Sequence, residues 1–269
     1  MLRQRLVTGT ISVLLAVGAV LWLPTAYFAL VIGILALISA WEWTALLRFP
    51  SLLVRIIYLI FIALCLWAAL HHLPVLAVMT AACLWWLIAL VWVLRFPKGR
   101  SIWANKWVGA LAGVWILVPT WLALVSLHVN GAAGPYAVLF LLAMTWIADT
   151  AAYFSGRRWG SVKLAPEISP GKTWEGVGGA VLAIIVYAAV GSGLLFSGKM
   201  PVIFILLCLV TLFFSVLGDL LESMFKRQAG VKDSGTLFPG HGGLLDRIDS
   251  LTAAAPVFML GLIVSGIMP

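Results

Sequence analysis

The sequence contains little charge for its length. Of its 269 residues, only 10% are Asp, Glu, Lys or Arg, whereas 64% are hydrophobic. A soluble domain carries roughly 25% charged residues, which help to cover its surface. The composition therefore excludes a soluble globular domain and also a disordered or collagen-like chain. It predicts an integral membrane protein that crosses the bilayer several times.

Cysteine is also scarce, with three residues, and none of them forms a Cys-x-x-Cys pair. Cys65, Cys83 and Cys208 all lie within hydrophobic runs, where a thiol behaves as a small apolar side chain. These positions argue against zinc, iron–sulfur and redox sites. The formal net charge of +8 does not indicate a nucleic-acid partner, because Lys and Arg lie between the hydrophobic runs rather than along one polar face.

Nine hydrophobic runs approach or reach the roughly 20 residues that a membrane-spanning helix needs. They cover residues 6–23, 26–47, 56–70, 75–94, 107–127, 135–154, 174–196, 201–221 and 250–268. If the N-terminus is cytoplasmic, every one of the 17 basic residues except Lys199 falls on the cytoplasmic side. We therefore expect an all-α polytopic membrane protein with about nine transmembrane helices, a cytoplasmic N-terminus and an external C-terminus.

Acidic residues are unevenly distributed between the two halves of the chain. Residues 1–134 contain a single acid, Glu42, while residues 135–269 contain the other eight. We interpret residues 1–134 as scaffold helices and residues 135–269 as the part that carries the site, within one integrated membrane domain. Glu42 lies between two tryptophans, so we interpret it as a residue of the membrane interface rather than a catalytic group.

The hydrophobic run at 201–221 ends in polar residues that share one helical face. Asp219, Glu222, Ser223 and Lys226 are spaced i, i+3, i+4 and i+7. A carboxylate at the end of an apolar helix is costly unless it is paired or hydrated, so it marks a candidate functional site. The alternative is a boundary charge that simply pairs with Lys or Arg.

A glycine-rich segment, residues 232–250, follows this helix. Its backbone N–H groups could form an anion-binding nest beside Lys226, Arg227, Lys232 and His241. Asp246 and Asp249 would then lie on the first turn of the last helix. Acids at that position have an alternative role, because they can cap the helix and interact with its dipole.

Carboxylates from two helix ends thus converge beside basic residues and a glycine-rich loop. Carboxylate oxygens suit Mg²⁺, which completes its coordination shell with water and substrate phosphates. Lys and Arg suit phosphate oxygens directly. The combination predicts metal-assisted phosphoryl or nucleotidyl transfer. Acyl transfer is not expected, since the sequence has no Gly-x-Ser-x-Gly motif.

The segment SPGKTWEG, residues 169–176, adds Lys172 as a candidate phosphate ligand. It is not a P-loop, because Pro166 occupies the position of the first glycine and we expect no strand before it. Thr173 could cap the following helix. Asp149 could form another wall of the site or pair with Arg157 or Arg158. We assign no chemistry to the histidines near the external boundary: His71, His72 and His128.

The segment SMFKRQAGVKDSGTLFPGHGGLLDRID, residues 223–249, resembles the signature of the CDP-diacylglycerol synthases, also called phosphatidate cytidylyltransferases. The segments SPGKTWEG and SVLGDLLES are similar to other parts of that family. The matching residues are Ser223, Lys226, Arg227, Lys232, Asp233, Gly235, Pro239, His241, Gly242, Gly243, Asp246, Arg247 and Asp249.

This resemblance implies transfer of CMP from CTP to phosphatidate, which yields CDP-diacylglycerol and pyrophosphate in phospholipid biosynthesis. It also implies dependence on Mg²⁺, with a second cation left open, and a homodimer among the lipids of the bacterial inner membrane. The active site would face the cytoplasm. Asp219 and Asp246 would be the metal ligands, and Lys226 and Asp249 would complete the catalytic set. Phosphate-binding residues would be Lys172, Ser223, Arg227, Lys232, His241, Gly242, Gly243 and Arg247.

Two other functions remain open at this stage. One is a different membrane phosphotransferase that acts on a lipid phosphate, although the Asp-x-x-Asp-Gly string of the alcohol transferases is lacking because Ser250 follows Asp249. The other is an ion-coupled transporter that uses the acids as an ion path. The confinement of these acids to one side of the membrane argues against a transporter.

Overall fold

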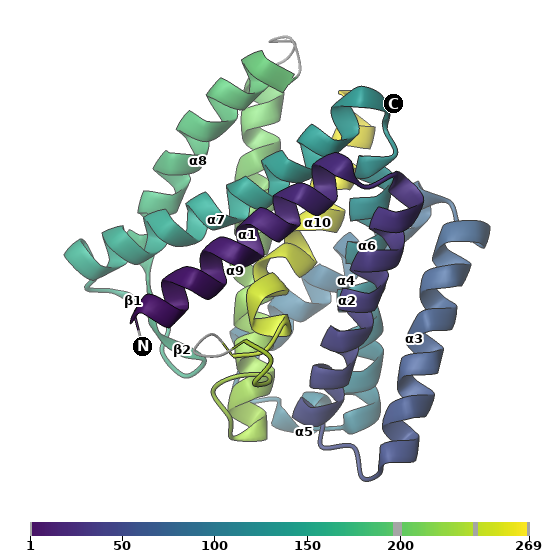
Figure 1. Cartoon of the computed structure of the whole chain (residues 1–269). Coiled ribbons are helices and arrows are strands. Elements are labelled where there is room, and N and C mark those ends of the chain that lie inside the picture. Colours follow the sequence, from purple (N-terminus) through teal and green to yellow (C-terminus); the bar gives the residue numbers. More distant parts are fainter. Residues whose placement is uncertain (1, 196–200, 239–241, 268–269) are drawn as a thin grey trace.

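The computed structural model describes residues 2–195, 201–238 and 242–267. These residues are almost entirely helical, with one short hairpin of β-strands (Figure 1). The elements in chain order are α1 (Leu2–Trp22), α2 (Thr25–Leu46), α3 (Leu52–His72), α4 (Val75–Arg95), α5 (Arg100–Trp103), α6 (Lys106–His128), η1 (Gly131–Ala133), α7 (Gly134–Trp159), β1 (Lys163–Ala165), β2 (Ser169–Thr173), α8 (Trp174–Leu195), α9 (Pro201–Ala229) and α10 (Leu245–Ser265).

Eight of the described helices are long and apolar enough to cross a membrane, and α1 adds a shorter apolar stretch at Thr8–Trp22. The nine hydrophobic runs thus each correspond to a helix, which confirms an all-α polytopic membrane protein. The helices differ in how far they are covered by protein. The apolar window of α6 is 72% buried and that of α10 is 61% buried, whereas that of α3 is 22% buried. The centre of the bundle therefore lies at α6 and α10, with α3 at its periphery.

Several helices extend beyond the hydrophobic runs that predicted them. Helix α3 starts four residues before the run at 56–70, and the Ser51 hydroxyl accepts a hydrogen bond from Val54 N at 3.4 Å as its N-cap. Helix α9 continues eight residues past the run at 201–221, and α10 begins five residues before 250. Hydropathy alone misses the added turns of α9 and α10 because they contain charged residues, whereas the added turn of α3 is apolar apart from Arg55.

The hairpin was not predicted. Strands β1 and β2 pair antiparallel, with Lys163 opposite Thr173 and Ala165 opposite Ser169. The expectation of no strand in this segment was therefore wrong, although two short antiparallel strands do not make a P-loop. Thr173 caps α8 as expected, since its hydroxyl accepts a hydrogen bond from Gly176 N at 3.1 Å.

Helices α9 and α10 pack side by side, and α7 packs against α8. Helix α1 lies across the face of α7, with the N-terminus near the hairpin and the C-terminus at the opposite end of the bundle (Figure 1). The hairpin, α5 and the C-terminal end of α9 lie at one end, which we call the hairpin end. Most of the polar residues singled out from the sequence gather there.

Candidate active site

A lysine on the hairpin forms an ion pair with the end of α9. Lys172 Nζ in β2 lies 2.6 Å from Asp219 Oδ2, and the two side chains are 25% and 24% exposed. The Ser223 hydroxyl, one turn further along α9, donates to Asp219 Oδ1 at 3.1 Å. Three predicted site residues are thus in direct contact. The pair is open enough to water for a phosphate to exchange with the carboxylate on Lys172.

A second lysine, Lys226, lies in a more enclosed cluster. Its Nζ is 2.7 Å from Glu222 Oε2 and 2.6 Å from Asp246 Oδ1, so it joins α9 to the first turn of α10. All three side chains are at most 10% exposed. Glu222 Oε1 is buried and has no hydrogen-bond partner among the described residues. Two carboxylates therefore share one buried cation, and one carboxylate oxygen still lacks a partner.

Asp246 also holds the glycine-rich loop in place. Its Oδ2 accepts hydrogen bonds from Ser234 N at 2.8 Å, the Ser234 hydroxyl at 3.0 Å and Gly243 N at 2.8 Å. A Cβ at Gly242, where φ is +82°, would lie 2.5 Å from the same oxygen. Asp246 therefore orders the loop by accepting its N–H groups, as a capping residue does, while it pairs with Lys226.

Glu42 reaches this loop from α2 and was misinterpreted from the sequence. Its side chain is buried, and its oxygens accept hydrogen bonds from Leu244 N at 2.9 Å, Leu245 N at 2.8 Å and the Ser234 hydroxyl at 3.2 Å. The interpretation as an interfacial residue was wrong, because this carboxylate is enclosed by the loop and the start of α10. The available signal was that Glu42 is the single acid in the first 134 residues.

Two further acids surround the pairs. Asp249 on α10 lies within electrostatic range of Asp219 and Glu222. Asp149 on α7 lies within range of Asp219, Lys172 and Arg247. In the part of the chain that the structure describes, it forms no salt bridge with an arginine of its own helix, so that alternative was wrong. Asp149 is therefore a candidate wall of the site.

The remaining basic residues have different surroundings. Arg227 Nε donates to Ile168 O at 3.0 Å and thereby ties α9 to the hairpin, so it has a structural role whatever it binds. Lys232 and Arg247 are exposed. His241 lies outside the described residues, and Gly242 and Gly243 border that gap. The anion nest predicted for this loop remains a prediction.

The carboxylates suit a hard cation in their chemistry. Among the described residues, no three His, Cys, Asp or Glu side chains are close enough together to hold a metal ion by themselves. Mg²⁺ commonly takes only one or two protein carboxylates and fills its shell with water and substrate phosphates. Among the described residues, Asp246 Oδ1 accepts from Lys226 alone, whereas its Oδ2 accepts from two backbone N–H groups and lies within reach of the Ser234 hydroxyl. The residues thus fit a cation that is bound together with substrate.

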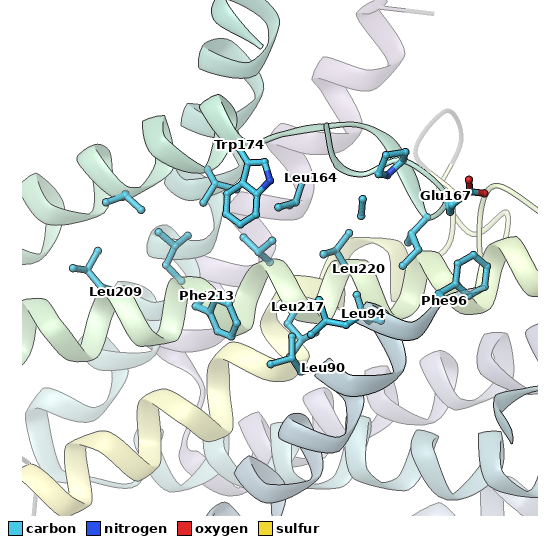
Figure 2. A pocket seen from close by; sticks show the side chains of 18 residues that line it. Leu90, Leu94, Phe96, Leu164, Glu167, Trp174, Leu209, Phe213, Leu217 and Leu220 are labelled. Carbon is cyan, nitrogen blue, oxygen red and sulfur yellow. The ribbon is translucent and has the colours of Figure 1, made fainter. Parts of the chain in front are cut away.

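An apolar pocket of about 410 Å³ lies beside this polar region, between α4, α8, α9 and the hairpin (Figure 2). Glu167, at one end of the pocket, is the one charged residue among those that line it. The hairpin that carries Lys172 also covers the pocket. Its lining includes Leu90, Leu94, Leu164, Trp174, Val216, Leu217 and Leu220.

Comparison with known proteins connects this arrangement to a family. The model of the cytidylyltransferase family matches residues 3–264. A phosphatidate cytidylyltransferase of Pseudomonas aeruginosa is 43% identical over 265 residues, which cover 96% of each chain. One of Haemophilus influenzae is 38% identical over 282 aligned positions, covering 96% of this chain and 97% of the relative. The chain therefore belongs to the cytidylyltransferase family.

Proposed function

We propose that the protein transfers CMP from CTP to phosphatidate and so forms CDP-diacylglycerol and pyrophosphate. The observation that carries the proposal is the near full-length similarity to relatives named for this reaction, and the pairs Lys172–Asp219 and Lys226–Asp246 of this chain lie at one end of the bundle. Family membership favours nucleotidyl transfer over the transporter and over other lipid phosphotransferases.

The reaction needs no nucleophile from the protein. A phosphate oxygen of phosphatidate attacks the α-phosphorus of CTP, and the bond from that phosphorus to the β-phosphate oxygen breaks as pyrophosphate leaves. The protein's task is to align the phosphates and offset their charge. Lys172 is the cation best placed to bind a phosphate, because its partner Asp219 is partly exposed. Ser223 orients Asp219, while Lys226 is held in place by two carboxylates.

We further propose that Asp219 and Asp246 bind Mg²⁺ together with the nucleotide. Bound there, Mg²⁺ would neutralise charge on the phosphate oxygens. Asp249 is a third candidate, because it shares the electrostatic environment of Asp219 and Glu222. Three neighbouring acids with few cations repel one another, and a divalent ion would offset that repulsion.

The apolar pocket supports a lipid as the second substrate. We propose that an acyl chain of phosphatidate enters it while the lipid phosphate reaches Lys172. The pocket residues and the polar residues occupy adjoining faces of α9, and the hairpin contacts both sites. A lipid whose headgroup lies at the polar face would therefore have an apolar cavity beside it.

For localisation, we propose the bacterial inner membrane with the hairpin end towards the cytoplasm. The concentration of Lys and Arg in the connections predicted as cytoplasmic supports this orientation. CTP would then arrive from the aqueous phase and phosphatidate from the leaflet. The homodimer remains a proposal based on the family resemblance, and mass measurement of the detergent-solubilised protein would test it.

The decisive experiment follows labelled CTP in detergent micelles that contain phosphatidate and Mg²⁺. We expect label to enter the lipid with an equal release of pyrophosphate, and both signals to disappear on chelation and return with added Mg²⁺. No transfer from any nucleotide, with protein of verified helical content, would contradict the proposed function. Transfer that persists in the chelator would contradict the Mg²⁺ requirement alone.

A further inference from the structure

Glu42 is a buried acid that the proposed reaction does not use directly. It lies four residues before the end of α2, and only 6% of it is exposed. Every other charged residue among the first 134 is basic, yet none of the salt bridges in the described structure involves Glu42. A buried carboxylate without a cation needs hydrogen-bond donors to offset its desolvation.

Those donors all come from the glycine-rich loop and the start of α10. Consecutive backbone N–H groups, at Leu244 and Leu245, each donate to one carboxylate oxygen of Glu42. The first N–H groups of a helix have no partner within the helix, and a negative charge there interacts favourably with the helix dipole. Glu42 therefore caps α10 from a helix that is about 200 residues away in the sequence.

Ser234 links Glu42 to the site. Its hydroxyl oxygen lies 3.2 Å from Glu42 Oε2 and 3.0 Å from Asp246 Oδ2, so the single hydroxyl proton can be donated to either carboxylate. Asp246 in turn pairs with Lys226. A displacement of Glu42 would therefore be transmitted by two routes to Asp246, the acidic partner of Lys226: through Ser234 and through the first turn of α10.

Two glycines of the signature segment make room for this carboxylate. A Cβ at Gly235 would lie 2.5 Å from Glu42 Oε1, and a Cβ at Gly243 would lie 2.5 Å from Glu42 Oε2. Neither glycine has a positive φ, so backbone conformation does not explain them. The close approach of Glu42 does explain them, which indicates that the loop is built around this side chain.

We propose that Glu42 is a positioning residue for the transfer reaction. It holds the glycine-rich loop and the first turn of α10 so that Asp246, paired with Lys226, keeps its position in the site. The inference rests on the proposed function, but it assigns to the N-terminal helices a part in the site. Glu42 itself touches neither substrate nor metal.

The test replaces Glu42 by glutamine, which keeps the volume but leaves one oxygen to accept from two N–H groups. We expect Glu42→Gln to lower kcat about 10- to 100-fold, as for loss of a hydrogen bond to a charged group. The KM for phosphatidate should change less than kcat. Glu42→Asp should recover part of kcat because it restores the carboxylate. The matched control is Glu175→Gln, since Glu175 also accepts from two consecutive N–H groups, at Ser161 and Val162, but near the surface.

A second measurement separates this inference from the proposed function. Hydrogen exchange at the Leu244 and Leu245 amides should be faster in Glu42→Gln than in the wild type, whether or not either protein is active. The double variant Glu42→Gln/Ser234→Ala should lose little more kcat than Glu42→Gln alone, because both changes act on Asp246. Unchanged exchange, or full kcat in Glu42→Gln, would overturn the positioning role. An inactive wild type would overturn the function instead.

Discussion

The two lysine clusters at the hairpin end differ in burial, and this difference distinguishes residues that bind substrate from residues that maintain the geometry of the site. Lys172 and Asp219 form a single pair between a hairpin and a helix, and about a quarter of each side chain is exposed. Lys226 lies between Glu222 and Asp246, with at most a tenth of any of the three exposed. A partly hydrated pair can exchange partners at little cost, whereas a buried cluster must keep its charges matched. We infer that the first cluster exchanges its partner for substrate, whereas in the second Lys226 and Glu222 maintain the geometry of Asp246, the proposed metal ligand.

The largest expected effect comes from breaking the buried cluster. Lys226→Met would leave Glu222 and Asp246 buried without their shared cation, so we expect a loss of roughly 3–5 kcal/mol of stability. Thermal unfolding in detergent, followed by helical content, measures this change. The control Lys106→Met removes an exposed lysine at the start of α6 and should change stability by at most about 0.5 kcal/mol. Equal melting of the two variants would contradict the role of Lys226 in maintaining the geometry.

Breaking the exposed pair should have the opposite effect, with a large loss of activity and a small loss of stability. We expect Asp219→Asn to reduce kcat about 10²- to 10³-fold through loss of charge at the phosphates, with a stability change of at most about 1 kcal/mol. Parallel measurements of kcat and thermal unfolding would check both parts. A variant that unfolds as readily as Lys226→Met would remove the distinction between the clusters.

The pocket offers a test of the lipid side of the site. Val216→Phe would fill part of the cavity, and we expect the KM for long-chain phosphatidate to rise about tenfold, roughly equivalent to two displaced methylene groups at about 0.8 kcal/mol each. The KM for CTP should stay constant. Val210→Phe places the same side chain on an exposed part of α9 outside the pocket and should leave both constants unchanged. Equal KM values for the two variants would contradict acyl-chain binding there.

The smallest expected effect concerns the cap that joins the hairpin to α8. Thr173→Ala would remove the hydrogen bond to Gly176 N and should cost about 1 kcal/mol of stability. Thr173→Ser keeps the hydroxyl and should restore most of it. Because Thr173 follows Lys172, the alanine variant should also raise the KM for phosphatidate, by a smaller factor than Asp219→Asn lowers kcat. Identical unfolding of the alanine and serine variants would argue against the cap.

The sequence predicted the helices well because each crosses lipid and must be apolar along most of its length. It also predicted that Asp219 lies beside Ser223 and that Asp246 approaches Lys226, because helical spacing and one short loop constrain them. The hairpin escaped prediction because its strands are only three and five residues long, and hydropathy does not register such short pairing. The role of Glu42 was not predicted because its hydrogen-bond partners are distant in the sequence, and only the packing of α2 beside α10 brings them together.

The length of α9 determines how deep in the membrane each of the two lysine clusters lies. Its 29 residues measure about 43 Å, well beyond the roughly 30 Å of hydrocarbon that a spanning helix must cross. Asp219 and Lys226 are seven residues apart, or about 10 Å along the axis. For a helix close to the membrane normal, Lys172 and Asp219 then lie nearer the acyl chains and Lys226 nearer the water. One helix would thus hold the partly exposed pair and the buried cluster at successive heights within the headgroup layer.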